Sequence, residues 1–420
     1  MKKNVLFNMA LLCIGSLSAQ TVSVPDANLM QKFTTVTCAS YAENPEVFGN
    51  YVDANGDGQI QTSEALNVTG LDISTSAFNT SGDIVSLEGL QYFTNLKKLY
   101  VTGNQIANLD LTPFVNLQVL KCDHNNLAAL EISNLAQLNF VNCSFNSMTN
   151  LELNNLPQLK TLYSVVNELS TLSLNLPALE SLQLDSNQLT QLSLENLPAL
   201  KDFQASHNQF ATVVLQPAAS TLEYVNMSFN PLTSLDLSAM ATLRTLLVTN
   251  TSIETIDCSE TAINKLVCFD SPNLTYINVQ NNLLSSGDGD MLDFPFEFAN
   301  LPSLEGVCID AGEFSWLSSS TVNDPDVTIY SGADCSLGID NVRDQSVSIW
   351  PNPASDRLNI RSGNAVSGFT IVNTLGQAVL SGEVVATEDL TIEVSGLETG
   401  VYLVKLETNA GTSIHRIIRK

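Results

Sequence analysis

Residues 96–111 read LKKLYVTGNQIANLDL, and this stretch sets the pattern for the middle of the chain. Its apolar positions follow L-x-x-L-x-L-x-x-N-x-L-x-x-L-x-L, and the pattern returns about every 21 residues. The asparagine slot is filled by Asn104, Asn125, Asn146, Asn167, Asn187, Asn208 and Asn230, then by Thr251, Thr261 and Ser271 before Asn282. A short fixed period indicates a solenoid whose coils bury their apolar side chains against one another. The ten-residue step from Thr251 to Thr261 predicts an inserted half-turn.

Each repeat predicts one flattened coil with two arcs. The first arc, L-x-x-L-x-L, is a short strand whose leucines point inward and which stacks ~4.8 Å from the next coil. A second arc such as Leu109-Asp110-Leu111 predicts strands on the opposite side, and the prolines at 157, 177 and 198 favour turns over long helices. Buried asparagines can satisfy the backbone groups of each bend. We therefore expect a mainly β solenoid with parallel strands.

The repeats resemble the leucine-rich repeat family over about residues 68–310. The resemblance implies a concave strand face that displays the residues between and beside the inward leucines. On that face we predict ligand contacts from Tyr100, Lys121, Phe140, Asn142, Tyr163, Gln183, Gln204, Tyr224, Asn226 and Tyr276. Exposed aromatic side chains among amides and hydroxyls suit the recognition of a protein or a glycan. An alternative interpretation is that the aromatic residues only stabilise the parallel ladder by cross-strand contacts.

Composition excludes some functions and disfavours others. The chain of 420 residues is 44% hydrophobic and only 14% charged, which excludes disorder for most of it. Its formal net charge of −26 disfavours binding to nucleic acid. Three histidines and eight scattered cysteines supply little material for a catalytic or zinc site, so we expect no enzyme. The alternatives are a calcium-dependent secreted hydrolase, for which Asp288, Asp290 and Asp293 are the nearest acidic cluster, and a passive surface-layer or spacer protein.

The beginning of the chain predicts export. Residues 1–19 combine Lys2 and Lys3 with an apolar stretch that ends in small residues, which is typical of a secretory signal peptide. The stretch is shorter than the ~20 residues of a membrane span, and no later segment supplies such a run. We therefore expect no transmembrane segment in the mature chain.

A candidate calcium loop lies within residues 20–67, which we predict to be the N-terminal cap of the solenoid. The stretch from Asp53 to Glu64 fits the template D-x-[DN]-x-[DN]-G-x5-E at each required place. The predicted ligands are the side chains of Asp53, Asn55, Asp57 and Glu64, the carbonyl of Gln59 and a water near Gln61. The loop resembles those of EF-hand and dockerin proteins, which implies a structural Ca²⁺ ion. A Gly/Asp turn that binds no metal is the alternative.

Six of the eight cysteines fall into two groups, and Cys38 has no evident partner in the sequence. Cys122, Cys143, Cys258 and Cys268 occupy inward positions, where we expect them to pack as small apolar residues. Cys308 and Cys335 instead bracket the segment in which the repeat ends, and an exported protein allows disulfides. We predict a disulfide between them that closes a C-terminal cap at residues 311–336.

Residues 337–420 predict a separate domain. Short alternating strands divided by turn residues favour a small antiparallel β-sandwich. The order Trp350-Pro351-Asn352-Pro353, Asn373-Thr374-Leu375-Gly376, Leu397–Tyr402 and a basic end at Arg416–Lys420 resembles the C-terminal sorting domain of type IX secretion cargo. The resemblance implies delivery by the outer-membrane machinery of a Gram-negative bacterium, so that the protein is secreted or displayed on the outer surface.

Overall fold

The structure is a computed structural model that describes residues 20–75, 83–218, 220–238, 240–281, 296–310, 327–331, 335, 347–373, 378–408 and 411–420. It divides into two compact units, residues 1–329 and residues 330–420. The predicted signal peptide, the Asp288/Asp290/Asp293 cluster, Asn282 and most of the predicted C-terminal cap lie outside the described residues. No helix of the described chain is long and apolar enough to cross a membrane.

The first unit begins with a small cap that contains two α-helices, α1 (Ala27–Thr35) and α2 (Thr62–Asn67). Helix α1 starts at Asp26, whose Oδ1 accepts hydrogen bonds from the backbone N–H groups of the first turn, as an N-cap residue does. The Oδ2 atom of Asp26 accepts from the N–H groups of Val85 and Ser86. One buried carboxylate therefore both caps the helix and ties the cap to the first coil.

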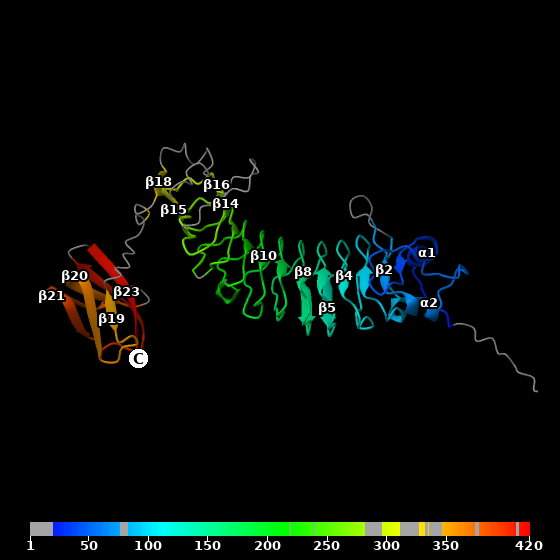
Figure 1. Cartoon of the computed structure of the whole chain (residues 1–420), viewed down its shortest axis with the longest axis horizontal. Coiled ribbons are helices and arrows are strands. Elements are labelled where there is room, and N and C mark those ends of the chain that lie inside the picture. The colour runs from blue at the N-terminus through cyan, green and yellow to red at the C-terminus, as the bar shows by residue number, and fades with distance from the viewer. Residues whose placement is uncertain are drawn as a thin grey trace, which may run out of the picture. The chain divides into compact units, whose positions relative to one another are not determined.

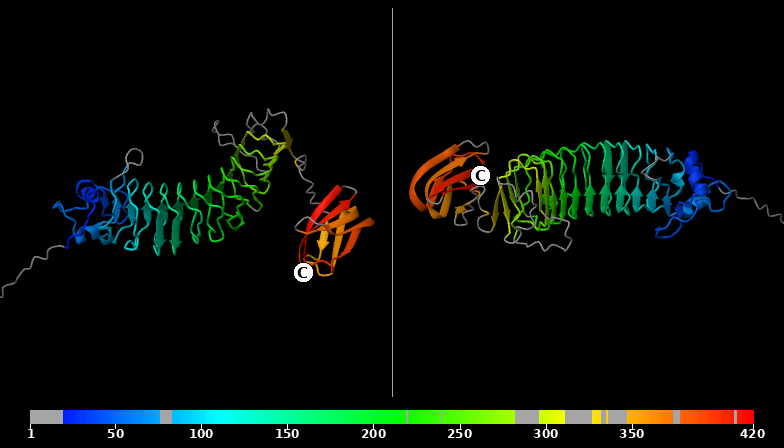
Figure 2. Two further views of the ribbon diagram at one scale, coloured as in Figure 1. Left: turned by 180° about the vertical axis from the view of Figure 1, so that it is seen from behind. Right: turned by 90° about the horizontal axis from the view of Figure 1, so that it is seen from above.

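One arc of each coil adds a strand to a long sheet (Figures 1 and 2). The twelve strands, in sheet order, are β1 (Ala39–Ser40), β2 (Gly70–Asp72), β3 (Lys98–Tyr100), β4 (Val119–Lys121), β6 (Phe140–Asn142), β8 (Thr161–Tyr163), β9 (Ser181–Gln183), β10 (Asp202–Gln204), β11 (Tyr224–Asn226), β12 (Thr245–Leu247), β14 (Lys265–Phe269) and β16 (Phe296–Ala299). Strands β1 and β2 are antiparallel, and every later pair is parallel. From β3 to β12 the central residue of each strand of this sheet is buried and its two neighbours face outward, which confirms the parallel-strand solenoid.

The second arcs form strands in only some coils. Strands β5 (Ala129–Ser133) and β7 (Asn150–Asn154) pair with each other, and β13 (Thr255–Asp257), β15 (Tyr276–Asn278), β17 (Gly306–Ile309) and β18 (Thr328–Ser331) form a separate four-stranded sheet. The other second arcs are irregular, apart from short 3₁₀ turns at Leu90–Tyr92 and Gln216–Ala218.

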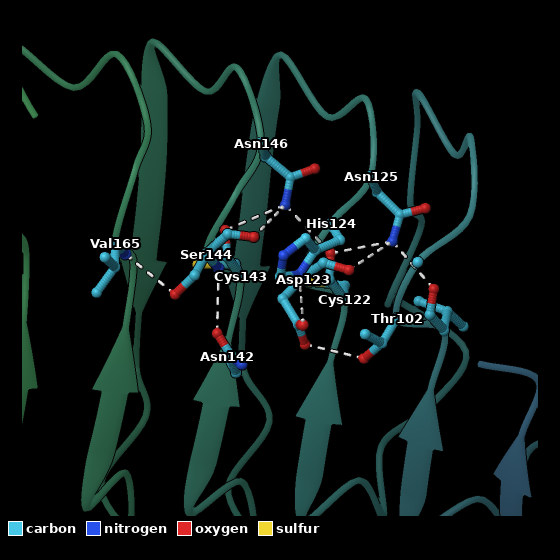
Figure 3. A network of polar contacts seen from close by, with 12 residues as sticks. Thr102, Cys122, Asp123, His124, Asn125, Asn142, Cys143, Ser144, Asn146 and Val165 are labelled. Carbon is cyan, nitrogen blue, oxygen red and sulfur yellow. Dashed lines mark hydrogen bonds and ion pairs between the residues drawn. The ribbon is translucent and has the colours of Figure 1, made fainter. Parts of the chain in front are cut away.

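The asparagine column joins consecutive coils by a repeated set of hydrogen bonds (Figure 3). The amide nitrogen of Asn125 donates to the carbonyls of Cys122 and Asp123 in its own coil and to Val101 O in the preceding coil, at 3.0–3.2 Å. Its Oδ1 accepts from Ile106 N of the preceding coil at 3.0 Å. Asn146, Asn187, Asn208 and Asn230 repeat this set. The predicted structural role of the column is confirmed.

The slot changes after Asn230. Thr251 N donates to Ser271 Oγ one coil later, so these two residues continue the column with hydroxyls. Thr261 lies elsewhere: it follows β13, and its Oγ1 donates to Cys258 O. The predicted half-turn between Thr251 and Thr261 is therefore wrong. Strand β12 pairs with β14 with Thr245 opposite Lys265, so the column continues from Thr251 to Ser271 at the usual spacing, and Thr261 belongs to the second arc.

The residue before each slot adopts a left-handed backbone conformation. Its φ angle lies between 52° and 75° in the coils of Gly103, His124, Phe145, Val166, Ser186, His207, Phe229, Asn250 and Asp270. Glycine and asparagine adopt this conformation readily, but a β-branched or bulky residue such as Val166 or Phe145 is strained there. We call these nine residues the left-handed column.

The second unit is a five-stranded antiparallel sheet. Strand β20 (Arg357–Val372) pairs with β19 (Ser348–Trp350), β21 (Ala378–Glu393) and β22 (Gly400–Thr408), and β22 pairs with β23 (Gly411–Arg419). Register shifts interrupt β20 near Val366, where a bulge increases twist and lets the sheet curl around its own core. The predicted antiparallel domain is thus confirmed, but its sandwich is one curled sheet and not two separate sheets.

Candidate functional site

An aromatic–lysine cluster lies on the outward side of the long sheet near its N-terminal end. Lys121 Nζ is 4.5 Å from the centre of the Tyr100 ring and 6.0 Å from that of Phe140, within the range of cation–π attraction. The rings of Phe140 and Tyr163 meet edge to face at 5.6 Å. Parallel pairing in register brings these four residues, which are 63 positions apart at most in the sequence, onto four consecutive strands of the sheet. We use the name aromatic–lysine cluster for Tyr100, Lys121, Phe140 and Tyr163.

The N-terminal cap extends this cluster, which the sequence did not predict. The Phe48 ring lies 5.3 Å from that of Tyr100 at an angle of 57°. Lys98 Nζ forms an ion pair of 2.9 Å with Glu46 from the same cap segment. Burial raises the pKa of the Tyr100 phenol, with Lys98 acting in the opposite direction. The phenol is therefore neutral and able to donate a hydrogen bond at physiological pH.

The next stretch of the sheet is polar and centred on an acid. Asp202 accepts hydrogen bonds from Ser181 Oγ at 2.9 Å and from Gln204 Nε2 at 3.0 Å. Tyr224 is its register partner on β11, and burial raises the pKa of Tyr224, with Asp202 and Asp185 adding to the shift. This part of the face thus carries negative charge, whereas the aromatic–lysine cluster carries positive charge.

The remaining predicted contact residues follow the same sheet with one exception. Gln183 faces outward on β9 between Tyr163 and Gln204. Asn142 and Asn226 also line the face, but each turns its Oδ1 to the N–H two residues on, and so shapes the end of its own strand. The placement of Tyr276 was wrong, because β15 belongs to the four-stranded sheet of the second arcs. Tyr276 follows the slot residue Ser271 by five positions, as Leu109 follows Asn104, and so lies on the second arc of its coil.

Two aromatic stacks on the left-handed column were also missed. The His124 and Phe145 rings stack at 4.3 Å, and those of His207 and Phe229 at 4.1 Å, each across neighbouring coils. Phe145 and Phe229 are exposed, and His124 Nδ1 lies 3.0 Å from Asp123 Oδ2 (Figure 3). Each of these four residues stands one position before a slot asparagine, and this shared position in the repeat could have predicted the stacks.

The predicted calcium loop is closed by hydrogen bonds to its carboxylates. Asp53 is buried and accepts from the N–H groups of Gly56, Asp57 and Gly58 at 2.8–3.2 Å. Glu64 is buried too and accepts from Ala54, Asn55 and Gln61. Gly56 and Gly58 have positive φ angles, which lets the loop wrap around these oxygens.

The donor chemistry of the loop fits Ca²⁺, while its side chains are arranged as hydrogen-bonding partners. Gln61 Nε2 lies 2.9 Å from Asp57 Oδ2 and 3.5 Å from Gln59 O, and so touches two of the predicted ligand oxygens. Asn55 Nδ2 donates to Asp57 Oδ2 and Gln61 Oε1. Within the described chain no group of three or more His, Cys, Asp or Glu side chains converges as a metal site. Ca²⁺ binding would therefore require the Gln61 amide group to turn away.

The two groups of cysteines differ in whether they are free or disulfide-bonded. Cys122, Cys143, Cys258 and Cys268 are free and fully buried, which confirms their predicted place in the core. Burial raises the pKa of the Cys143 thiol to about 12, so almost no thiolate exists at neutral pH to bind metal or act as a nucleophile. Cys308 and Cys335 are both disulfide-bonded.

The family model of the "Secretion system C-terminal sorting domain" matches residues 348–420. These residues form β19 to β23 of the second unit. The end of the chain is attached to the Trp350–Pro353 motif, because Ile418 N donates to Asn352 Oδ1 and Ala354 N donates to Ile418 O. The match indicates export by the type IX system, so the protein reaches the cell surface or the medium.

Several solved structures resemble the chain at low identity. The functional domain of InlJ from Listeria monocytogenes, described as including a cysteine ladder, is 18% identical, with 96% of this chain and all of that chain covered and a TM-score of 0.37. The internalin InlF from Listeria monocytogenes is 19% identical over 67% of this chain and 95% of that chain, with a TM-score of 0.36. YopM, a leucine-rich effector protein from Yersinia pestis, is 27% identical over 57% and 65%, with a TM-score of 0.39. No curated protein matches the chain significantly.

Proposed function

We propose that the chain is a secreted or cell-surface leucine-rich-repeat binding protein that recognises a macromolecule on the outward face of its long sheet. The observation that supports this most is the aromatic–lysine cluster. Its rings and ammonium group face solvent from a rigid parallel ladder, so ordering them on binding costs little conformational entropy. Phe48 extends the aromatic surface toward the cap, and Tyr224 adds a separate ring three strands beyond Tyr163.

Substitution of the cluster tests the proposal. Phe140→Ala and Tyr163→Ala remove the edge-to-face pair, and we expect each to weaken capture of the partner in pull-downs from bacterial and host surface extracts or on a glycan array. Aromatic anchors at interface centres contribute about 2 kcal/mol or more, so the expected loss is thirtyfold or greater. Tyr276→Ala is the matched control, since Tyr276 occupies a strand of the other sheet. Unchanged binding by Phe140→Ala and Tyr163→Ala would move the site off this face.

Delivery to the surface is proposed to depend on the sorting domain. Removal of residues 340–420 should leave the repeats in the periplasm, as measured by surface proteolysis and cell fractionation. Surface display of the shortened chain would contradict this part of the proposal.

We also propose that the loop from Asp53 to Glu64 holds a structural Ca²⁺ ion through Asp53, Asn55, Asp57, Glu64 and the Gln59 carbonyl. The burial of two carboxylates within one short loop supports this, because a divalent cation would neutralise them. Calorimetric titration with Ca²⁺ should show one site that Asp53→Ala and Glu64→Ala abolish. Heat of binding that persists in both variants, or its absence in the unaltered chain at millimolar Ca²⁺, would reject the site.

A further inference from the structure

The basic residues of the repeats are confined to one side of the coils. Between residues 68 and 310 the sequence holds 24 Asp and Glu but seven Lys and Arg. These seven are Lys97, Lys98, Lys121, Lys160, Lys201, Arg244 and Lys265. Each lies in a strand of the long sheet or directly before one. The second arcs between residues 68 and 310 carry acids and no base.

Backbone hydrogen bonds align four of these residues in one row along the sheet edge. Gln118 N donates to Lys97 O, Asn139 N to Gln118 O and Lys160 N to Asn139 O, at 2.8–2.9 Å. The same bond continues the row through Glu180, Lys201, Glu223 and Arg244. We call Lys97, Lys160, Lys201 and Arg244 the basic row. Its charges are separated by three, two and two coils, or about 14, 10 and 10 Å.

Ion pairs within the basic row add too little stability to explain why the basic residues lie on the long sheet. Lys160 and Lys201 lie 2.9 Å and 3.5 Å from the carboxylate of Glu180. The two lysine side chains remain 58% and 52% exposed, and pairs as exposed as these contribute only about 0–1 kcal/mol to stability.

Stability alone would place bases elsewhere. Glu131 and Glu152 are direct register partners on β5 and β7, and both are exposed. Like charges opposite each other destabilise a ladder, and a neighbouring lysine would relieve them. All seven basic residues are nevertheless on the long sheet. Their confinement therefore indicates selection for what this face contacts.

We propose that the partner of the long sheet is a linear anionic polysaccharide that runs along the stack of coils. Its carboxylate or sulfate groups pair with the basic row, and its sugar rings pack on Tyr100, Phe140 and Tyr163, which lie one or three residues after the row positions of their coils. Glu180 and Glu223 lie in the same row and Asp202 on the same face, so the anionic groups pair with the bases individually and the sugar hydroxyls donate hydrogen bonds to these acids. Acids of the other faces that lie further away than ~8 Å are screened at physiological ionic strength. This inference rests on the proposed function and narrows its partner.

The test is binding of polygalacturonate and dextran sulfate to the full chain, with neutral dextran as the reference ligand. The variant Lys160→Gln/Lys201→Gln/Arg244→Gln should lose at least tenfold in affinity, and affinity of the unaltered chain should fall as salt rises. The matched control Arg357→Gln/Arg361→Gln/Lys405→Gln removes the same charge from exposed positions of the sorting domain and should bind normally. Circular dichroism shows that both variants are folded before affinity is compared.

The proposal is overturned if neither polyanion binds, if the basic-row variant binds as tightly as the unaltered chain, or if poly-glutamate binds more tightly than both polysaccharides. A neutral glycan or protein whose binding requires Phe140 but not the basic row would reject the polyanion while preserving the proposed function. Loss of binding in the basic-row variant alone, with salt dependence, would establish it.

Discussion

The coils from Asn104 to Asn230 and the coils that begin at Thr251 close the same bend with different chemistry. In most of the earlier coils, as at Asn125, one amide serves four backbone groups, two of which belong to the preceding coil. In the later coils Thr251 and Ser271 have single hydroxyls, which bond mainly to Val248 O and to each other. The later coils are also where the four-stranded sheet of the second arcs starts, at β13. An amide both donates and accepts hydrogen bonds and thus fixes the position of one coil on the next, whereas a single hydroxyl constrains the neighbouring coil less.

The largest effect should come from the amide itself. Asn125→Ala leaves buried backbone groups of two coils without partners, at about 1–3 kcal/mol each, so we expect a loss of about 3 kcal/mol or more in unfolding free energy. Urea unfolding followed by circular dichroism measures it, and hydrogen exchange should show the loss in the flanking coils. Asn126→Ala, on an exposed neighbour, should change stability by less than about 0.5 kcal/mol. Equal losses of unfolding free energy in Asn125→Ala and Asn126→Ala would show that the slot amide has no special role.

Asp26, which joins the cap to the first coil, should make stability depend on pH, unlike the neutral amide column. Burial acts to raise the pKa of Asp26, but hydrogen bonds from Leu29, Val85, Ser86 and Asn28 outweigh it and hold the pKa below its ordinary value. The stability from Asp26 is therefore present above about pH 4 and is lost as pH falls through the lowered pKa. Asp26→Ala should cost about 1–2 kcal/mol at pH 7 and progressively less below pH 4. A cost that is constant from pH 7 to pH 2 would show that the carboxylate charge is unimportant.

A hydroxyl should contribute less than an amide in the same slot. Thr251→Ala removes the bond to Val248 O and the contact with Ser271, and we expect a loss of about 1 kcal/mol in unfolding free energy. The same urea titration measures this loss, and Ser252→Ala, at the next position in the chain, is the matched control. A loss as large as that of Asn125→Ala would remove the contrast between the two groups of coils.

The smallest effect should be a gain. Val166 is β-branched and held at φ 53°, where asparagine is less strained. Val166→Asn should stabilise the chain by about 0.5–1 kcal/mol in urea unfolding, whereas Val165→Asn, one residue earlier and outside the left-handed column, should not. Destabilisation by Val166→Asn would mean that packing of the exposed valine outweighs its backbone strain.

Periodicity made most of the fold predictable, and it failed where hydroxyl residues replace the slot asparagine. Leu99, Leu120 and Val141 could be placed inward because a strand alternates sides and the repeat fixes the register. Tyr276 was misplaced because the second arcs have an apolar spacing close to that of the first arcs, so that Thr261 was taken for a slot residue. The contact of Phe48 with Tyr100 could not be predicted, since it joins an irregular cap loop to the ladder. The calcium loop shows a further limit: the template identifies oxygen donors, but hydrogen bonds decide where they point.

Each slot asparagine forms hydrogen bonds to the preceding coil, and this has an evolutionary consequence. Because every amide bonds only to its own coil and the one before it, gain or loss of a whole 21-residue unit would leave each remaining pair intact. Asn104, the first of the series, shows the boundary of this rule. Its Oδ1 is the one buried side-chain nitrogen or oxygen atom in the described chain that has no hydrogen-bond partner. Descendants of this gene could therefore lengthen or shorten the array by duplication, one coil at a time, and change the reach of its face by ~4.8 Å per step.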